Sequence, residues 1–108
     1  MAITETNKID SVVSSKEHNE VVLLITDHLD WSDDLEHQQL LQAKINSYIR
    51  FIESGQLCEE FPEDKGKQVS IVVACAFELN DTAKKFYERV NNFLKEKLSI
   101  EIKYTMSS

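Results

Sequence analysis

Two strand-length stretches of the chain are almost continuously apolar between polar flanks. They are EVVLLITD at Glu20–Asp27 and QVSIVVACAF at Gln68–Phe77. A short apolar run without alternation is typical of a strand that is buried on both faces. Ile9–Val13 is short and β-prone, and it lies close enough to Glu20–Asp27 to pair with it as a hairpin. Apolar and polar residues alternate in Ser99–Thr105, which predicts a strand with one wet face at the edge of a sheet.

Two other stretches repeat apolar residues at helical spacing. The first, Ser32–Ser54, predicts a helix of roughly 20 residues, about 30 Å long. Its apolar stripe is formed by Leu41, Ile45, Tyr48 and Ile52. Asp33 and Glu36 have capping-box spacing at its start, and Gly55 is placed to end it. The second helix follows the capping sequence LND at Leu79–Asp81. Its stripe is formed by Ala83, Phe86, Tyr87, Val90, Phe93, Leu94 and Leu98.

The order of these elements, β-β-α-β-α-β, predicts an α+β fold. We expect one domain over residues 1–108, with flexible ends at 1–8 and 105–108 and one long loop at Gly55–Lys67. Each helix has a single apolar stripe, which predicts a two-layer sandwich with a mixed four-stranded sheet. Two right-handed crossovers that progress the same way place both helices on one face of that sheet.

One layer of helices leaves the other face of this apolar sheet uncovered. We expect an alternating set of residues on the bare side, and the pattern leaves open which of two sets it is. One set is Val22, Leu24, Val72, Ala74 and Ala76, and the other is its complement. An uncovered apolar face usually marks an interface. Because no third long helix is available, we expect a homodimer that joins two copies of this face by a two-fold contact.

The charges indicate which partners the chain can accept. The net charge is −7 at pH 7, and residues 1–64 hold 14 acidic against 4 basic residues. Such a surface repels nucleic acids and anionic membranes, so we expect neither as a partner. The acidity is either a solvated surface or a docking surface for a basic protein. With Cys58 expected to be exposed, Cys75 expected to be buried, and no secretory signal or membrane-length apolar run, we expect a cytoplasmic protein.

Polar residues gather where the two buried strands end. TDHLDW closes the first strand and ELND follows the second. Parallel strands bring their carboxyl ends to the same edge of a sheet, and ligands of open α/β sheets bind at that edge. Our candidate ligand or partner site therefore consists of Asp27, His28, Asp30, Trp31, Glu78 and Asp81.

Three interpretations of this edge are open. A divalent ion would take oxygen ligands from Asp27, Asp30 and Glu78. A zinc ion would use His28 and His37 with a carboxylate. In the third interpretation the acids cap the helix, the tryptophan packs on its first turn, and the second histidine lies at the edge of the core. No zinc motif, nucleophile elbow or phosphate loop occurs, so we expect the third, with no catalytic residue, no metal and no cofactor.

A second acidic segment, CEEFPED, lies beyond the far end of the first helix. Its acids are Glu59, Glu60, Glu63 and Asp64. The helix separates them from TDHLDW by roughly 30 Å, which a protein lying along the helix can bridge and a small ligand cannot. We expect a non-enzymatic interaction protein, such as an inhibitor or immunity-type protein for a basic nuclease toxin. The alternative is a small-ligand-binding protein or metal-dependent enzyme with its site around Asp27–Trp31.

Four segments together resemble one family of proteins. They are IDSVV, VVLLITDHLDW, LLQAKINSYIRFIESGQL and FPED, and the likeness extends from Ile9 to Tyr104. The family consists of small bacterial proteins known only as a domain of unknown function. The resemblance therefore implies a bacterial single-domain protein, and it brings no activity and no catalytic residue with it.

Overall fold

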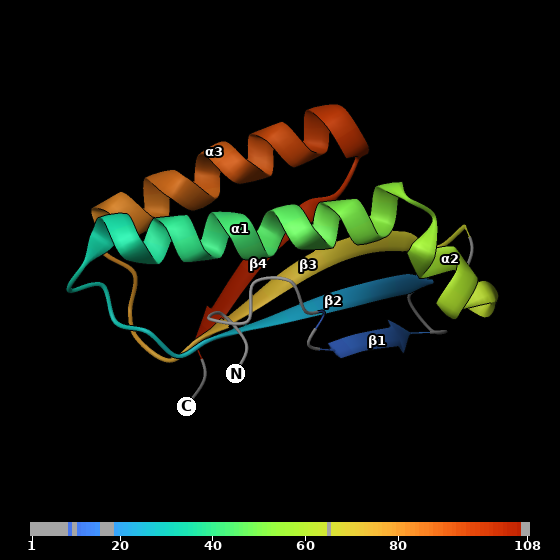
Figure 1. Ribbon diagram of the computed structural model, residues 1–108, viewed down its shortest axis with the longest axis horizontal. Helices are drawn as coiled ribbons and strands as arrows, with labels where there is room; N and C mark the ends of the chain where they lie inside the picture. The colour runs from blue at the N-terminus through green and yellow to red at the C-terminus, as the bar shows by residue number, and fades with distance from the viewer. Residues whose placement is uncertain (1–8, 10, 16–18, 65, 107–108) are drawn as a thin grey trace.

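The fold is given by a computed structural model, which describes residues 9, 11–15, 19–64 and 66–106 (Figure 1). The α+β class and the mixed four-stranded sheet predicted from the sequence are confirmed. The elements are β1 (Ser11–Ser15), β2 (Glu20–Asp27), α1 (Asp34–Glu53), α2 (Gln56–Glu60), the 3-10 turn η2 (Pro62–Asp64), β3 (Gln68–Cys75), α3 (Asp81–Leu98) and β4 (Glu101–Met106).

Two segments differ from the expectation. Gly55–Lys67 was expected to be a loop, but it contains α2 and η2. Its turn of helix forms because Leu57 is buried against the core, while the side chain of Gln56 donates a hydrogen bond to Glu60 at 2.8 Å. β4 continues to Met106, so two residues assigned to the C-terminal end belong to the sheet. The expected flexible ends at 1–8 and 107–108 lie outside the described residues.

The sheet has the strand order β1-β2-β3-β4. β1 pairs antiparallel with β2, as expected for the hairpin, and β2, β3 and β4 are parallel to one another. The register sets Ile25 beside Val73 and Asp27 beside Cys75. The carboxyl ends of β2 and β3 therefore lie together, which brings the loop before α1 next to the loop before α3.

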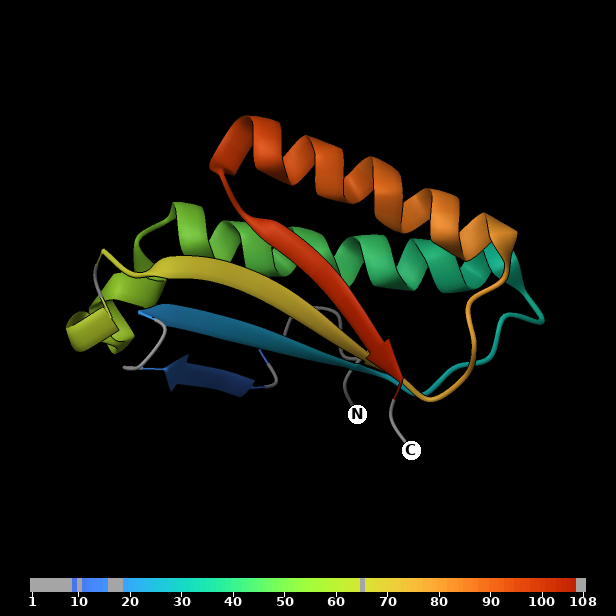
Figure 2. The same ribbon diagram turned by 180° about the vertical axis from the view of Figure 1, so that it is seen from behind.

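α1 and α3 lie over the same face of the sheet (Figures 1 and 2). The strand residues that point to the helices alternate along the chain, and they include Val21, Leu23, Ile25, Ile71 and Val73, all 0% exposed. The helices meet them with Leu41, Ile45, Tyr48, Phe86, Tyr87 and Leu94. Burying these side chains is the main stabilising contribution to such a fold. The two-layer arrangement predicted from the helix stripes is confirmed.

Side-chain caps fix the starts of both long helices. Asp33 accepts a hydrogen bond from the backbone N–H of Glu36 at 3.1 Å, and Asn80 accepts one from the N–H of Ala83 at 2.9 Å. The amide of Asn80 also donates to Oδ1 of Asp34 at 2.7 Å. This last bond joins the two helix starts directly, so α1 and α3 begin at a common point above the carboxyl end of the sheet.

Two strands have backbone groups that bond to a helix side chain. The hydroxyl of Tyr48 on α1 donates to the carbonyl of Leu24 in β2 at 2.5 Å. The side-chain oxygen of Asn91 on α3 accepts the N–H of Ile102 in β4 at 3.2 Å. These bonds hold the helix layer on the sheet and satisfy polar backbone groups at the same time.

The face of the sheet away from α1 and α3 carries the alternate residues of the strands. Val22, Leu24, Val72 and Ala74 are half-buried there, and Val13 of β1 is 53% exposed. This is the first of the two alternating sets that we expected, without Ala76, which lies beyond the end of β3. We refer to these five residues as the outer face.

Candidate functional site

The corner between β2 and α1 holds a buried pair of polar side chains. Asp27 ends β2, His37 lies in the first turns of α1, and each is 1% exposed. Nε2 of His37 is 2.5 Å from Oδ2 of Asp27. The other carboxylate oxygen, Oδ1, accepts the backbone N–H of Leu29 at 3.1 Å. The carboxylate of Asp27 therefore fixes both the connecting loop and the helix that follows it.

Both ring nitrogens of His37 are occupied. Nδ1 is 2.8 Å from the carbonyl of Asp30, and because a carbonyl only accepts, Nδ1 carries a hydrogen. Burial alone lowers the pKa of His37, but the hydrogen bond and charge of Asp27, with the carbonyl of Asp30, outweigh burial and raise that pKa above 6.5. The raised pKa favours an imidazolium paired with a carboxylate. No ring nitrogen is left to bind a metal or to take a proton from a substrate.

Aromatic and sulfur groups enclose this pair. The indole of Trp31 stacks on the ring of His37, with centroids 3.6 Å apart and planes inclined by 15°. At the end of β3, Sγ of Cys75 is 3.9 Å from the hydroxyl of Tyr87. Burial raises the pKa of the Cys75 thiol and that of the Tyr87 phenol. A protonated, buried thiol is a poor nucleophile, so Cys75 is not suited to covalent catalysis.

Apart from Trp31, the other residues predicted for this edge have exposed side chains, unlike the buried pair. Those exposed at the edge are His28, Asp30, Glu78 and Asp81. The divalent-ion set is not assembled, because Asp27 turns inward to His37. The zinc set is not assembled either, because His28 is exposed while His37 is enclosed. Within the residues that the structure describes, no three His, Cys, Asp or Glu side chains gather as metal ligands.

The second acidic segment lies at the opposite end of α1 from this corner (Figure 1). Glu59 and Glu60 belong to α2, Glu63 belongs to η2, and all three are exposed. The side chain of Asp64 is outside the described part of the chain. Acidic groups are thus found at both ends of α1, as the sequence analysis expected.

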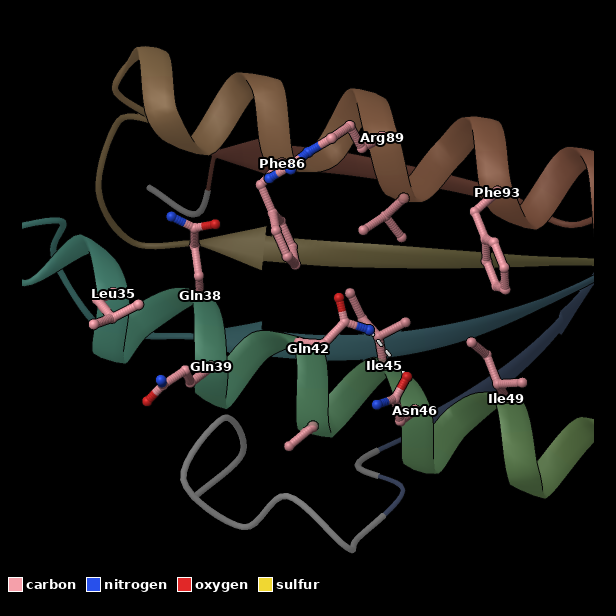
Figure 3. Close-up of a pocket in the computed structure, with 12 residues that line it drawn as sticks. Leu35, Gln38, Gln39, Gln42, Ile45, Asn46, Ile49, Phe86, Arg89 and Phe93 are labelled. Carbon is pink, nitrogen blue, oxygen red and sulfur yellow. Dashed lines mark hydrogen bonds between the residues drawn. The ribbon is translucent and has the colours of Figure 1, made fainter.

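A groove between α1 and α3 was not identified from the sequence. Its volume is about 720 Å³. The lining residues are Leu35, Gln38, Gln39, Gln42, Ala43, Ile45, Asn46 and Ile49 of α1 with Phe86, Arg89, Val90 and Phe93 of α3. Phe86 and Phe93 point from α3 toward α1, and Ile49 points back toward Phe93 (Figure 3). The amides of Gln42 and Asn46 on the α1 side bond to each other at 2.9 Å.

The groove has an apolar floor that is open to solvent. Phe93 is 52% exposed and Leu35 is 68% exposed, and Arg89 is the one charged residue among those that line the groove. The sequence shows a wide apolar stripe on α3, but it does not show the distance between the two helices. The stripe of α3 is too wide for one contact: Tyr87 and Leu94 meet the core, and Phe93 lies beside them on a second row.

The fold and the groove define the chain as a two-layer α/β sandwich with an open furrow between its two long helices. The model of the family of unknown function DUF6572 matches residues 1–108, so the chain belongs to this family, and the resemblance to an uncharacterised domain is confirmed. No curated protein and no solved structure matches the chain. Among the residues described, no helix is long and apolar enough to cross a membrane.

Proposed function

We propose that this protein is a non-enzymatic interaction domain that binds a basic protein partner along α1. The observation that carries the proposal is the groove between α1 and α3. A monomer has little reason to leave aromatic side chains such as Phe93 half-exposed in a continuous apolar furrow, and furrows of this kind accept helices or loops of other proteins. Arg89 offers its N–H donors to the carbonyl groups of such a segment.

The charges around the groove suit a basic partner. Exposed acids lie before α1, at Asp30 and Asp33, and beyond its end, at Glu59, Glu60 and Glu63. A segment lying over the groove extends toward both acidic regions, because α1 has 20 residues and is about 30 Å long. The acidic ends attract a basic protein and orient it, while the apolar floor between them provides the buried area.

The chemistry of the two regions supports binding over catalysis. The groove is lined by amides, apolar side chains and one guanidinium, and it offers no carboxylate, imidazole or thiol for acid–base or nucleophilic steps. At the alternative site around Asp27–Trp31, His37 has no free ring nitrogen. The side chains there cap backbone groups, which is the arrangement expected of a structural corner.

The most concrete form of this function is an inhibitor or immunity-type protein that neutralises a basic toxin in the bacterial cytoplasm. The net charge of −7 favours a basic partner. Both cysteines, Cys58 and Cys75, are free thiols, which favours a reducing compartment.

A pair of matched phenylalanine variants tests the groove. Phe93 is 52% exposed and lines the groove, whereas Phe77 is 49% exposed and is not among its lining residues. The partner is captured from the native host with the wild-type protein, purified, and titrated against Phe93→Glu and Phe77→Glu. We expect Phe93→Glu to weaken binding at least tenfold, which corresponds to about 1.4 kcal/mol, and Phe77→Glu to bind like the wild type. Equal affinities for the two variants would remove the groove from the interface.

The contribution of the acidic segment beyond α1 to binding is tested by measuring the rate of association. The variant with Glu59, Glu60 and Glu63 changed to Gln and Asp64 changed to Asn should associate more slowly with the same purified partner. The difference from the wild type should shrink as ionic strength rises through the range in which the Debye length is about 8 Å. An unchanged association rate at low salt would mean that this end of α1 does not steer the partner.

A further inference from the structure

The outer face of the sheet is a second apolar surface, on the opposite side of the molecule from the groove. Its members are Val13, Val22, Leu24, Val72 and Ala74, contributed by three neighbouring strands. The register sets Val13 beside Val22 and Leu24 beside Val72, so the five side chains are contiguous. Both long helices lie on the other face (Figures 1 and 2). We propose that this face binds a second copy of the chain across a two-fold axis.

Two pairs of polar side chains on this face bond within the chain. The hydroxyl of Ser70 donates to Oε1 of Glu20 at 2.7 Å, and Ser70 is only 3% exposed. On β4, Nζ of Lys103 is 3.5 Å from Oε1 of Glu101. A polar side chain that is already hydrogen-bonded within the chain costs less to desolvate than an unpaired one. The outer face is therefore suited to being covered.

The charge of the face favours a second copy over the basic partner proposed for the groove. The protein as a whole is strongly acidic, but the described part of this face carries one base, Lys103, beside Glu101, with Glu20 bonded to Ser70. A basic protein finds no acidic patch here. A two-fold axis that crosses the strands between these two positions sets Lys103 against Glu101 of the second copy, twice, and by the same register it sets Val22 of β2 against Leu24 of the second copy.

Such a dimer has a consequence for the proposed function. The groove lies on the helix side of each copy, so both grooves face outward on opposite sides of the dimer. A partner with two docking segments, or a partner that is itself dimeric, then binds through both grooves at once with a gain in avidity. The dimer itself does not rest on the proposed partner, and each surface can be broken without touching the other.

Mass measurements over a range of concentration test the second copy. The chain has a mass of 12.5 kDa, and we expect light scattering to give twice this value for the wild type at high micromolar concentration. Val72→Lys places a charge at the centre of the face and should give a folded chain of 12.5 kDa under the same conditions. Phe93→Glu, which alters only the groove, should remain dimeric. If Val72→Lys loses its circular dichroism signal, Val13→Lys at the exposed margin serves in its place.

A charge exchange tests the two-fold geometry. Lys103→Glu alone and Glu101→Lys alone each bring like charges together across the axis and should raise the dimer dissociation constant at least tenfold. The double exchange restores opposite charges and should restore the dimer. A wild type that stays at 12.5 kDa throughout overturns the proposal. A dimer that survives Val72→Lys and Val13→Lys overturns it equally.

Discussion

The corner at the end of β2 and the groove between the helices use their side chains in opposite ways. The corner is rich in polar groups, yet those groups bond to one another: Asp27 to His37, and His37 to the carbonyl of Asp30. The groove is poor in ionisable groups, and it leaves aromatic and aliphatic surface open at Phe93 and Leu35. The corner, whose sequence is rich in polar residues, is therefore buried and fully bonded. The groove, whose sequence has few ionisable residues, is exposed to solvent.

A cluster of polar residues in a sequence does not by itself mark a binding site. The side chains must also leave donors, acceptors or apolar surface that the chain does not use. At the corner, each described capping oxygen meets a backbone donor or a side chain. In the groove, the surplus is apolar area that is open to solvent. Variants that open the corner and variants that change the groove test whether the two regions contribute separately to stability and to binding.

The largest effect is expected from removing the buried carboxylate. Asp27→Asn leaves His37 without its charged partner inside the protein, and breaking a buried pair in this way costs about 3–5 kcal/mol. Denaturant unfolding of the variant should show this loss in the free energy of unfolding. His28→Ala, at the exposed neighbouring position, should change it by less than about 0.5 kcal/mol. A stable Asp27→Asn protein would mean that the pair does not hold the corner together.

Thiol labelling of the two cysteines shows, without a denaturant, whether Asp27→Asn opens the corner. Cys58 is exposed on α2, and Cys75 is buried at the corner with a raised thiol pKa. In the wild type, a thiol reagent should label Cys58 quickly and Cys75 only when the chain opens. In Asp27→Asn, labelling of Cys75 should accelerate and labelling of Cys58 should not. Rapid labelling of Cys75 in the wild type would show that the corner is open.

A smaller effect is expected from pH. The pKa of His37 is higher in the folded chain than its unfolded value of 6.5, so the folded state binds the proton more tightly and protonation stabilises the fold. This contribution is complete below pH 6.5 and is lost as pH rises through the folded pKa. The free energy of unfolding should therefore fall as pH rises above 6.5 in the wild type and in His28→Gln. It should fall less in His37→Gln, and equal slopes in all three would contradict the assignment.

Loss of a helix cap should lower the free energy of unfolding by a smaller amount. Asp33→Ala and Asn80→Ala each remove a side chain that accepts a backbone N–H at a helix start, which typically costs about 1 kcal/mol. Asn80→Ala should be the more damaging of the two, because it also removes the bond to Asp34 that joins the two helix starts. Thermal unfolding of both variants compares them. An equal or smaller loss for Asn80→Ala would mean that the link between helix starts adds nothing.

The smallest change in stability is expected in the groove. Phe93→Ser removes a half-exposed ring and should alter the free energy of unfolding by less than about 0.5 kcal/mol, while it weakens binding of the partner. Denaturant unfolding measures the first quantity and titration with the purified partner measures the second. A large loss of stability would show that Phe93 belongs to the core and that the groove is not a free surface.

Metal ions should leave both regions unchanged. A native ion at a hundred times its dissociation constant raises the free energy of unfolding by about 2.7 kcal/mol. We expect no shift in melting temperature with zinc, magnesium, manganese or calcium, because Asp27 and His37 use their bonding capacity on each other. A shift that disappears in His28→Ala would restore a metal site to this edge.

The sequence predicts the fold well because periodicity is a local property. The runs in β2 and β3 and the caps at Asp33 and Asn80 can be assigned from spacing alone, and the structure confirms them. The stripe of α1 is confirmed at Leu41, Ile45 and Tyr48, but Phe51 is buried where Ile52 was expected. The Asp27–His37 contact could also have been predicted from the sequence. Asp27 has the same parity as Val21, Leu23 and Ile25, and His37 lies one turn before Leu41, so both side chains point to the core.

The groove could not be predicted from the sequence. Its width depends on how far apart α1 and α3 pack on the sheet, and that distance results from side-chain volumes that no single stripe reveals. The apolar positions of α3 showed that the helix is buried, but not that Phe93 would lie half outside the contact. In the same way, alternation gave two candidate outer faces, and only the burial of Val21 and Ile71 under the helices identified the outer set as the one that contains Val22 and Val72.

The edge strand β4 is protected against pairing with a further strand. Unpaired backbone groups on an edge strand are a template for further strands, and growth along such an edge leads to open ribbons and fibres. Here the side chain of Asn91 occupies the N–H of Ile102, and the charged Glu101 and Lys103 alternate with it along the strand. A strand added to β4 would have to displace the side chain of Asn91 and remove water from Glu101 and Lys103. The β4 edge is therefore a poor template for a further strand.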